Sequence, residues 1–151
     1  MHHIARWHDR IVAILGSRLS EGVVLLLVRI TLAGVFWRSG RSKVTEGSLF
    51  EISGSTWYLF ENDYAGVPLP AEIAAPLATV GEHLFPMLLL IGLATRMSAS
   101  ALLVFTLVIQ IFVYPEAWWT THILWVALAT VLIVRGGGVV SFDAVLSHWR
   151  A

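Results

Sequence analysis

Four long apolar stretches separated by polar segments dominate the pattern of hydrophobic and polar positions along this chain. A helix that crosses a membrane needs about 20 predominantly apolar residues, and each stretch reaches or approaches that length. The pattern therefore predicts an all-α fold, a transmembrane four-helix bundle, within a single membrane domain covering residues 1–151. We expect the spans at about residues 22–43, 71–95, 97–114 and 117–134.

Two shorter helices are expected on either side of the spans. Over residues 1–20, apolar side chains recur every three or four positions, which is typical of an amphipathic helix lying on an anionic membrane surface. The histidines of this segment lack thiolate support, so we predict no metal site there. In the tail, residues 139–151, Ser141 is placed to cap a short C-terminal helix with Asp143 in its first turn.

The first two spans are joined by an outer loop, residues 44–70, which is rich in glycine, serine, aromatic and acidic residues. Aromatic rings suit the headgroup region, so we expect this loop to be an ordered lid across the helix ends. Six arginines gather on the opposite side if both termini lie there together, whereas Arg38, Arg41 and Lys43 on the loop side break this pattern and suggest ion pairing within an outward-facing pocket. The positive-inside rule then predicts a multi-pass protein of a bacterial-type cytoplasmic (inner) membrane, with both termini cytoplasmic.

Composition supports a membrane protein and narrows its chemistry. Of the 151 residues, 57% are hydrophobic and 13% are charged, and the formal net charge is zero, so no nucleic-acid partner is expected. The chain has no cysteine, which excludes disulfides, thiolate metal sites and covalent thiol catalysis. Any redox role would therefore need a bound cofactor or a partner protein.

Several polar side chains fall within the spans, where an ionisable group is costly and normally faces a protein interior or a wet cavity. Counting about 1.5 Å per residue from the helix ends places them between the outer surface and the midplane. We therefore predict one polar pocket in which Glu82 either pairs with a cation or holds a proton. The residues expected around it are Arg41, Lys43, Glu82, His83, Gln110, His122 and Trp125.

This pocket supports two hypotheses equally well. One is a quinone-like ligand, whose carbonyls accept hydrogen bonds and whose reduction takes up protons; Glu82 and Lys43 are then the candidate catalytic residues, and the other five bind the ligand. The other is a structural ion-pair network that holds the helices together. A metal ion is not predicted, because Glu82 and His83 point about 100° apart on a helix.

Three further polar residues are interpreted as structural. Arg29, about two turns inside the first span, is expected to donate to carbonyls near the inner face or to pair with Asp143. Arg96 occupies the tight turn between the second and third spans, where an interfacial arginine is expected.

Three motifs extend over most of the chain: Arg29 with Gly34, Phe36, Gly40 and Lys43; Glu82 followed by residues 90–96; and Gly136-Gly137-Gly138 leading to Ser141-Phe142-Asp143. In this order and spacing they resemble the DoxX family of small four-helix membrane proteins. The resemblance implies a membrane bundle and marks the positions to test as Arg29, Lys43, Glu82, Arg96 and Asp143. DoxX-like proteins include a subunit of a thiosulfate:quinone oxidoreductase and a component of a mycobacterial membrane complex for oxidative-stress defence.

Three functional hypotheses follow. The first is a redox-linked membrane protein, such as a subunit of a quinone-linked oxidoreductase, that binds quinone or a similar small apolar ligand and carries no covalent cofactor. The alternative is a non-catalytic membrane subunit or scaffold whose acidic, aromatic loop docks a protein partner, and the third is a small-solute transporter. Besides the lipid bilayer, the expected partners are a protein of a membrane complex or a second copy of the chain.

Overall fold

A computed structural model describes residue 7 and residues 12–149 of the chain. The named elements within them are all helices, and four helical segments are long and apolar enough to cross a membrane. The predicted all-α fold with four spans and a short C-terminal helix is therefore confirmed. The spanning segments are α2 (Arg18–Ser42), α4 (Ala71–Ile91), α5 (Thr95–Phe112), and a fourth made of η1 (Pro115–Ala117), the π-helical η2 (Trp118–His122) and α6 (Ile123–Arg135).

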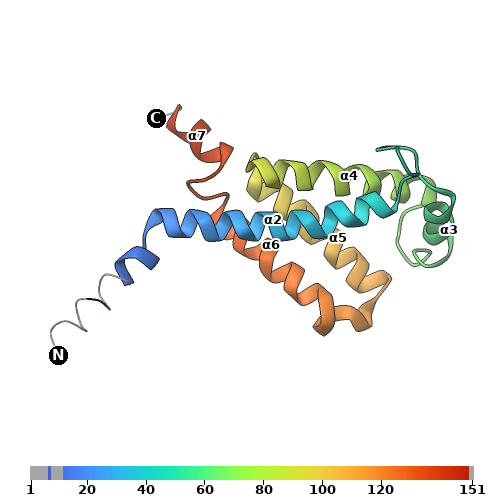
Figure 1. Cartoon of the computed structure of the whole chain (residues 1–151). Coiled ribbons are helices and arrows are strands. Elements are labelled where there is room, and N and C mark those ends of the chain that lie inside the picture. The colour runs from blue at the N-terminus through green and yellow to red at the C-terminus, as the bar shows by residue number, and fades with distance from the viewer. Residues whose placement is uncertain (1–6, 8–11, 150–151) are drawn as a thin grey trace.

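The four spans form a ring of neighbours. The helix α2 packs on α4 and α6, and α5 packs on the same two helices. Figure 1 shows that α2 begins and α6 ends on the side where α7 (Phe142–His148) lies, which we call the terminal end. The short helix α3 (Gly54–Asn62) lies at the opposite end, which we call the loop end.

Apolar side chains fill the centre of this bundle and also cover its outside. Alanines such as Ala33, Ala99 and Ala129 are fully buried, and small side chains let membrane helices approach closely. Large apolar side chains on the outer faces, such as Leu27 and Val134, are more than 60% exposed. In a bilayer these outer faces contact lipid. The buried cluster is Leu25, Leu32, Ala33, Phe36, Leu89, Ala99, Leu102, Ala129 and Leu132.

The first span begins four residues earlier than predicted because Ser17 caps it. The Ser17 hydroxyl accepts a hydrogen bond from the amide of Ser20 at 3.2 Å, so the helix starts at Arg18. Of the predicted interfacial helix over residues 1–20, residues 12–15 are helical, and Gly16 and Ser17 separate them from α2. Residues 1–6 and 8–11, which include all three N-terminal histidines, lie outside the described residues.

The predicted outer loop is attached to the end of α2. Its helix α3 is capped by Ser53, and the amide of Ser53 and the hydroxyl of Thr56 both donate to the carbonyl of Lys43 at 3.0 Å. Phe60 packs against Ala74 and other residues of α4. The loop therefore lies over the ends of both α2 and α4.

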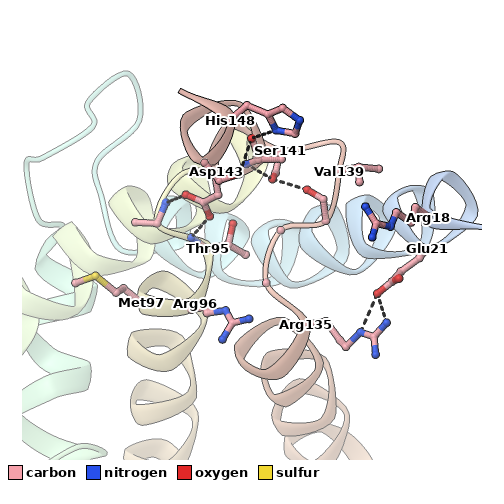
Figure 2. A pocket seen from close by; sticks show the side chains of 16 residues that line it. Arg18, Glu21, Thr95, Arg96, Met97, Arg135, Val139, Ser141, Asp143 and His148 are labelled. Atoms are coloured by element: carbon pink, nitrogen blue, oxygen red, sulfur yellow. Dashed lines mark hydrogen bonds and ion pairs between the residues drawn. The ribbon is translucent and has the colours of Figure 1, made fainter. Parts of the chain in front are cut away.

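The turn between α4 and α5 is fastened to the C-terminal tail (Figure 2). The carboxylate of Asp143 accepts hydrogen bonds from the amides of Ala94 at 2.8 Å and Thr95 at 2.9 Å, and the amide of Asp143 donates to the carbonyl of Gly92. The second span ends at Ile91, earlier than predicted, because Gly92 adopts the left-handed conformation with φ +72°. The predicted cap of α7 is confirmed, since the Ser141 hydroxyl accepts from the amide of Ala144.

Gly92 should be far more sensitive to substitution than Gly47. A Cβ atom at position 92 would lie 1.8 Å from Nη1 of the buried Arg29, whereas nothing lies within 4 Å at Gly47, where φ is +82°. Gly47→Ala should cost about 1–2 kcal/mol for the left-handed backbone alone. Gly92→Ala should cost clearly more, because Arg29 must also move. Thermal unfolding of both variants in detergent measures the difference, and equal melting temperatures would contradict this account.

Candidate functional site

Two buried charged side chains form an ion pair between the end of α2 and the middle of α4. Nζ of Lys43 lies 2.7 Å from Oε2 of Glu82, and the two side chains are 7% and 2% exposed. Nζ also donates to the hydroxyl of Ser39 at 2.9 Å. Of the two expectations for Glu82, the structure therefore shows the paired one, with Lys43 as the cation.

A close contact between the two helices positions this pair. A Cβ on Gly40 would lie 3.0 Å from the carbonyl oxygen of Glu82 and from the ring of His83, so any larger residue would push against α4. Pro86 has no amide proton to donate to that same carbonyl of Glu82, four residues earlier in α4. The free carbonyl therefore faces the glycine of α2, and Glu82 is held directly opposite the end of that helix.

Lys43 and Glu82 line a cavity of about 170 Å³, which we call the ion-pair cavity. Its walls come from α4, α5 and the outer loop, and they are apolar except for the ion pair and the hydroxyl of Tyr64. Typical wall residues are Phe60, Leu77 and Phe105. An apolar ligand in this cavity would be surrounded by hydrocarbon side chains and would meet only a few polar groups.

Tyr64 is a site residue that the sequence alone did not reveal. Its ring stacks on Phe60 with centroids 4.6 Å apart and meets Tyr114 edge-on at 6.4 Å. Burial raises the pKa of Tyr64, and the neighbouring Tyr114 and Glu82 raise it further. The phenol therefore keeps its proton at neutral pH and remains a hydrogen-bond donor. The only sequence signal was the aromatic content of the outer loop, which does not say which ring turns inward.

The other five residues predicted around the pocket do not line this cavity. The ring nitrogen Nδ1 of His122 lies 2.7 Å from Oε1 of Gln110, whose amide nitrogen donates to the carbonyl of Pro115. The ring of Trp125 packs between those of His122 and Phe36, with centroids 5.2 and 5.5 Å away. These three residues therefore form a separate polar group between α5 and the fourth span.

His83 and Arg41 also make their contacts outside the ion-pair cavity. Nδ1 of His83 lies 2.7 Å from the carbonyl oxygen of Thr79, and its ring meets Trp37 edge-on. Arg41 donates to the carbonyl of Ser48 at 2.6 Å, which ties the outer loop to α2. In the described part of the chain, no three His, Asp or Glu side chains are close enough to hold a metal ion.

The three residues interpreted as structural all lie at the terminal end. Arg29 is 1% exposed and donates through Nη2 to the carbonyl of Val140, as expected for an arginine that serves carbonyls near that face. Asp143 binds the turn between α4 and α5. Arg96 is exposed at the start of α5, beside the loop that follows α6.

Substitution of Gly40 should disturb the ion pair, whereas substitution of Gly34 on the same helix should not. Gly40→Ala forces α2 away from α4, and overpacking of this kind costs about 1–3 kcal/mol. A Cβ at Gly34 meets nothing within 4 Å, so Gly34→Ala should be neutral or stabilise by up to about 1 kcal/mol. Thermal unfolding in detergent measures both effects. Equal stability of the two variants would show that the close approach at Gly40 is unimportant.

Comparisons with known proteins agree with this architecture. The family model DoxX matches residues 24–115, more than half of the chain, and this region includes every residue that lines the ion-pair cavity. A protein of Haemophilus influenzae, described as an uncharacterized protein, is 29% identical over 146 residues, which span 85% of this chain and 86% of the relative. No solved structure matches the chain. The chain therefore belongs to the DoxX family and is a multi-pass membrane protein.

Proposed function

We propose that this protein binds a quinone, or a similar small apolar ligand, in the ion-pair cavity and takes part in quinone-linked redox chemistry. The observation that carries the proposal is a buried Lys43–Glu82 pair in the wall of an otherwise apolar cavity. Perturbed or costly buried charges inside a cavity are the usual mark of a functional site.

The size and position of the cavity suit the ring of such a ligand. Its volume of about 170 Å³ lies below the roughly 300–1,000 Å³ that enclose a drug-sized molecule, so it holds one ring rather than a whole lipid. Leu77 and Val104 line the cavity and are also more than 50% exposed on the outer faces of α4 and α5. An apolar ligand dissolved in the bilayer would enter there, and its tail would remain in lipid.

The polar groups of the cavity match the needs of a quinone. An ammonium group has three donors, and Lys43 donates to Glu82 at 2.7 Å, to the hydroxyl of Ser39 at 2.9 Å and to the carbonyl of Ser39 at a long 3.4 Å. A ligand carbonyl would replace the long contact. Reduction of a quinone to a quinol takes two electrons and two protons. In the ion pair only the Lys43 ammonium carries a transferable proton, so we propose that Lys43 protonates the carbonyl oxygens one after the other and that the Glu82 carboxylate passes it a replacement proton taken up from water at the loop end. The electrons would come from a redox partner protein in the same membrane complex, which is oxidised.

We also propose that the terminal end faces the cytoplasm. Arg18, Arg96 and Arg135 lie at that end, and the sequence carries Arg6, Arg10 and Arg150 before and after the spans. Arg38, Arg41 and Lys43 lie at the loop end and depart from the pattern, but Lys43 pairs with Glu82 and Arg41 donates to the carbonyl of Ser48. The excess of arginine on the terminal side supports a cytoplasmic terminal end by the positive-inside rule.

The absence of cysteine makes this orientation directly testable. Glu61→Cys, in α3, and Ser147→Cys, in α7, each place a single thiol at an exposed position. In intact bacterial cells a membrane-impermeant maleimide should label Glu61→Cys but should label Ser147→Cys only after permeabilisation. The unsubstituted chain is the control for background labelling. The reverse pattern would show that the termini face outward.

A double substitution separates ligand binding from a merely structural ion pair. Glu82→Gln leaves the buried Lys43 ammonium unpaired, and breaking a buried pair in this way costs about 3–5 kcal/mol. Replacement of both residues, Lys43→Met with Glu82→Leu, should restore much of the stability, because apolar residues of similar volume often replace a buried pair without loss. The melting temperature in detergent follows this recovery.

Ligand binding should not recover with stability. Fluorescence quenching by a short-chain quinone analogue should show binding to the wild type and at least about tenfold weaker binding to the double variant, since a hydrogen bond to a charged group contributes about 1.5–3 kcal/mol. Arg38→Gln, an exposed cation at the loop end that does not line the cavity, is the matched control and should bind normally. Wild-type affinity in the stable double variant would instead favour a scaffold role for the pair, and no binding by the wild type would refute the proposal.

A further inference from the structure

A second and larger cavity lies at the terminal end, far from the ion pair along the bundle (Figures 1 and 2). Its volume is about 640 Å³, and it lies between the start of α2, the turn from α4 to α5, the loop after α6 and the helix α7. It shares no residue with the ion-pair cavity, so what it binds is independent of the proposed quinone site. We call it the terminal-end cavity.

The acidic side chains around the terminal-end cavity have partners within the protein, whereas two of its arginines have none in the described part of the chain. Its two carboxylates are already used, because Glu21 pairs with Arg135 and Asp143 binds two backbone amides. The guanidinium groups of Arg18 and Arg96 make no hydrogen bond or ion pair with any other residue that the structure describes. In Figure 2, Arg135 turns toward Glu21 while Arg96 projects separately near the end of α6. The cavity therefore carries an excess of positive charge.

Backbone amides at the start of α5 add uncharged hydrogen-bond donors to this basic site. The first amides of a helix have no carbonyl partner within it, and Asp143 takes those of Ala94 and Thr95 but not those of Arg96 and Met97. Thr95 also lines the cavity, but its hydroxyl oxygen is buried beneath the cavity wall, where it has no hydrogen-bond partner among the described residues. A helix start combined with unpaired arginines is a favourable setting for an anion with several oxygens.

The surroundings of the terminal-end cavity indicate where that anion comes from. Met97 and Val139 line the cavity and are 75% and 50% exposed, so apolar surface continues from its edge along the outside of the bundle. The cavity also lies at the level where α2 and α5 begin and α6 ends, which is the level of lipid headgroups. Basic pockets between helices at this depth suit acidic headgroups.

We propose that the terminal-end cavity binds a phosphate group, presented by an anionic phospholipid of the adjoining leaflet. Arg96 contacts the phosphate oxygens at the start of α5, Arg18 attracts the same headgroup from the other side of the cavity, and the acyl chains lie over Met97 and Val139. The lipid thereby joins the start of α5 to the start of α2, beside the contacts that Asp143 makes with the same turn.

Native mass spectrometry of the full chain tests this proposal. The protein is released from nanodiscs of phosphatidylcholine and phosphatidylglycerol, and the retained lipids are counted. The wild type should be enriched in phosphatidylglycerol relative to the nanodisc. Arg96→Gln should lower that enrichment about five-fold, as expected for one basic side chain near an anionic surface, and Arg96→Lys should keep more of it. Arg38→Gln, which removes an exposed cation at the loop end, is the matched control and should change nothing.

Competition with inorganic phosphate distinguishes the two sources of the group. Displacement of the lipid only at high phosphate concentration supports the membrane source. Phosphate binding that depends on Arg96, without any enrichment in phosphatidylglycerol, would overturn the lipid assignment in favour of a soluble phosphate. Equal enrichment in wild type and Arg96→Gln, or equal losses in Arg96→Gln and Arg38→Gln, would overturn the site itself. If Arg96→Gln does not fold, Arg18→Gln on a different helix makes the same test.

Discussion

This structure depends on one constraint, which is that water cannot solvate the charged side chains inside the membrane bundle. A lone ammonium or carboxylate inside a bundle is costly, so Lys43 and Glu82 must find each other, and this fixes how the loop end of α2 faces the middle of α4. The same requirement operates at the terminal end, where Arg29 reaches the carbonyl of Val140 and Asp143 reaches two amides of a turn. The two sets of polar contacts hold the bundle at opposite ends.

Glycine makes both sets of contacts geometrically feasible. At Gly40 the backbone of α4 comes close enough for the ion pair to form, and at Gly92 the absent side chain leaves room for the guanidinium of Arg29. Packing between membrane helices receives little help from the hydrophobic effect, because lipid is as apolar as the core. Close backbone approach and polar contacts therefore specify this arrangement, while the apolar cluster around Phe36 and Leu102 fills the space between.

The two cavities differ in size, polarity and net charge. The ion-pair cavity is small and apolar, opens between α4 and α5, and keeps its charges neutralised by each other. The terminal-end cavity is wide and has an excess of basic groups, because its acidic residues are already bound within the protein. The apolar ring proposed for the first and the anionic headgroup proposed for the second would occupy separate sites, so the two proposals are compatible in one small protein.

The sequence by itself determined the fold class, because about 20 apolar residues are needed to cross a bilayer and four such stretches are present. It also identified Ser141 as a cap and Lys43 as a cation able to pair with Glu82. Only the tertiary structure decided which polar residues share a cavity. Periodicity gives the depth of a side chain along its own helix but not the rotation of that helix against its neighbours, which the contact at Gly40 sets. The structure alone shows that Gln110 and His122 pair with each other, that Arg41 turns to the outer loop, and that Tyr64 lines the same cavity as the ion pair.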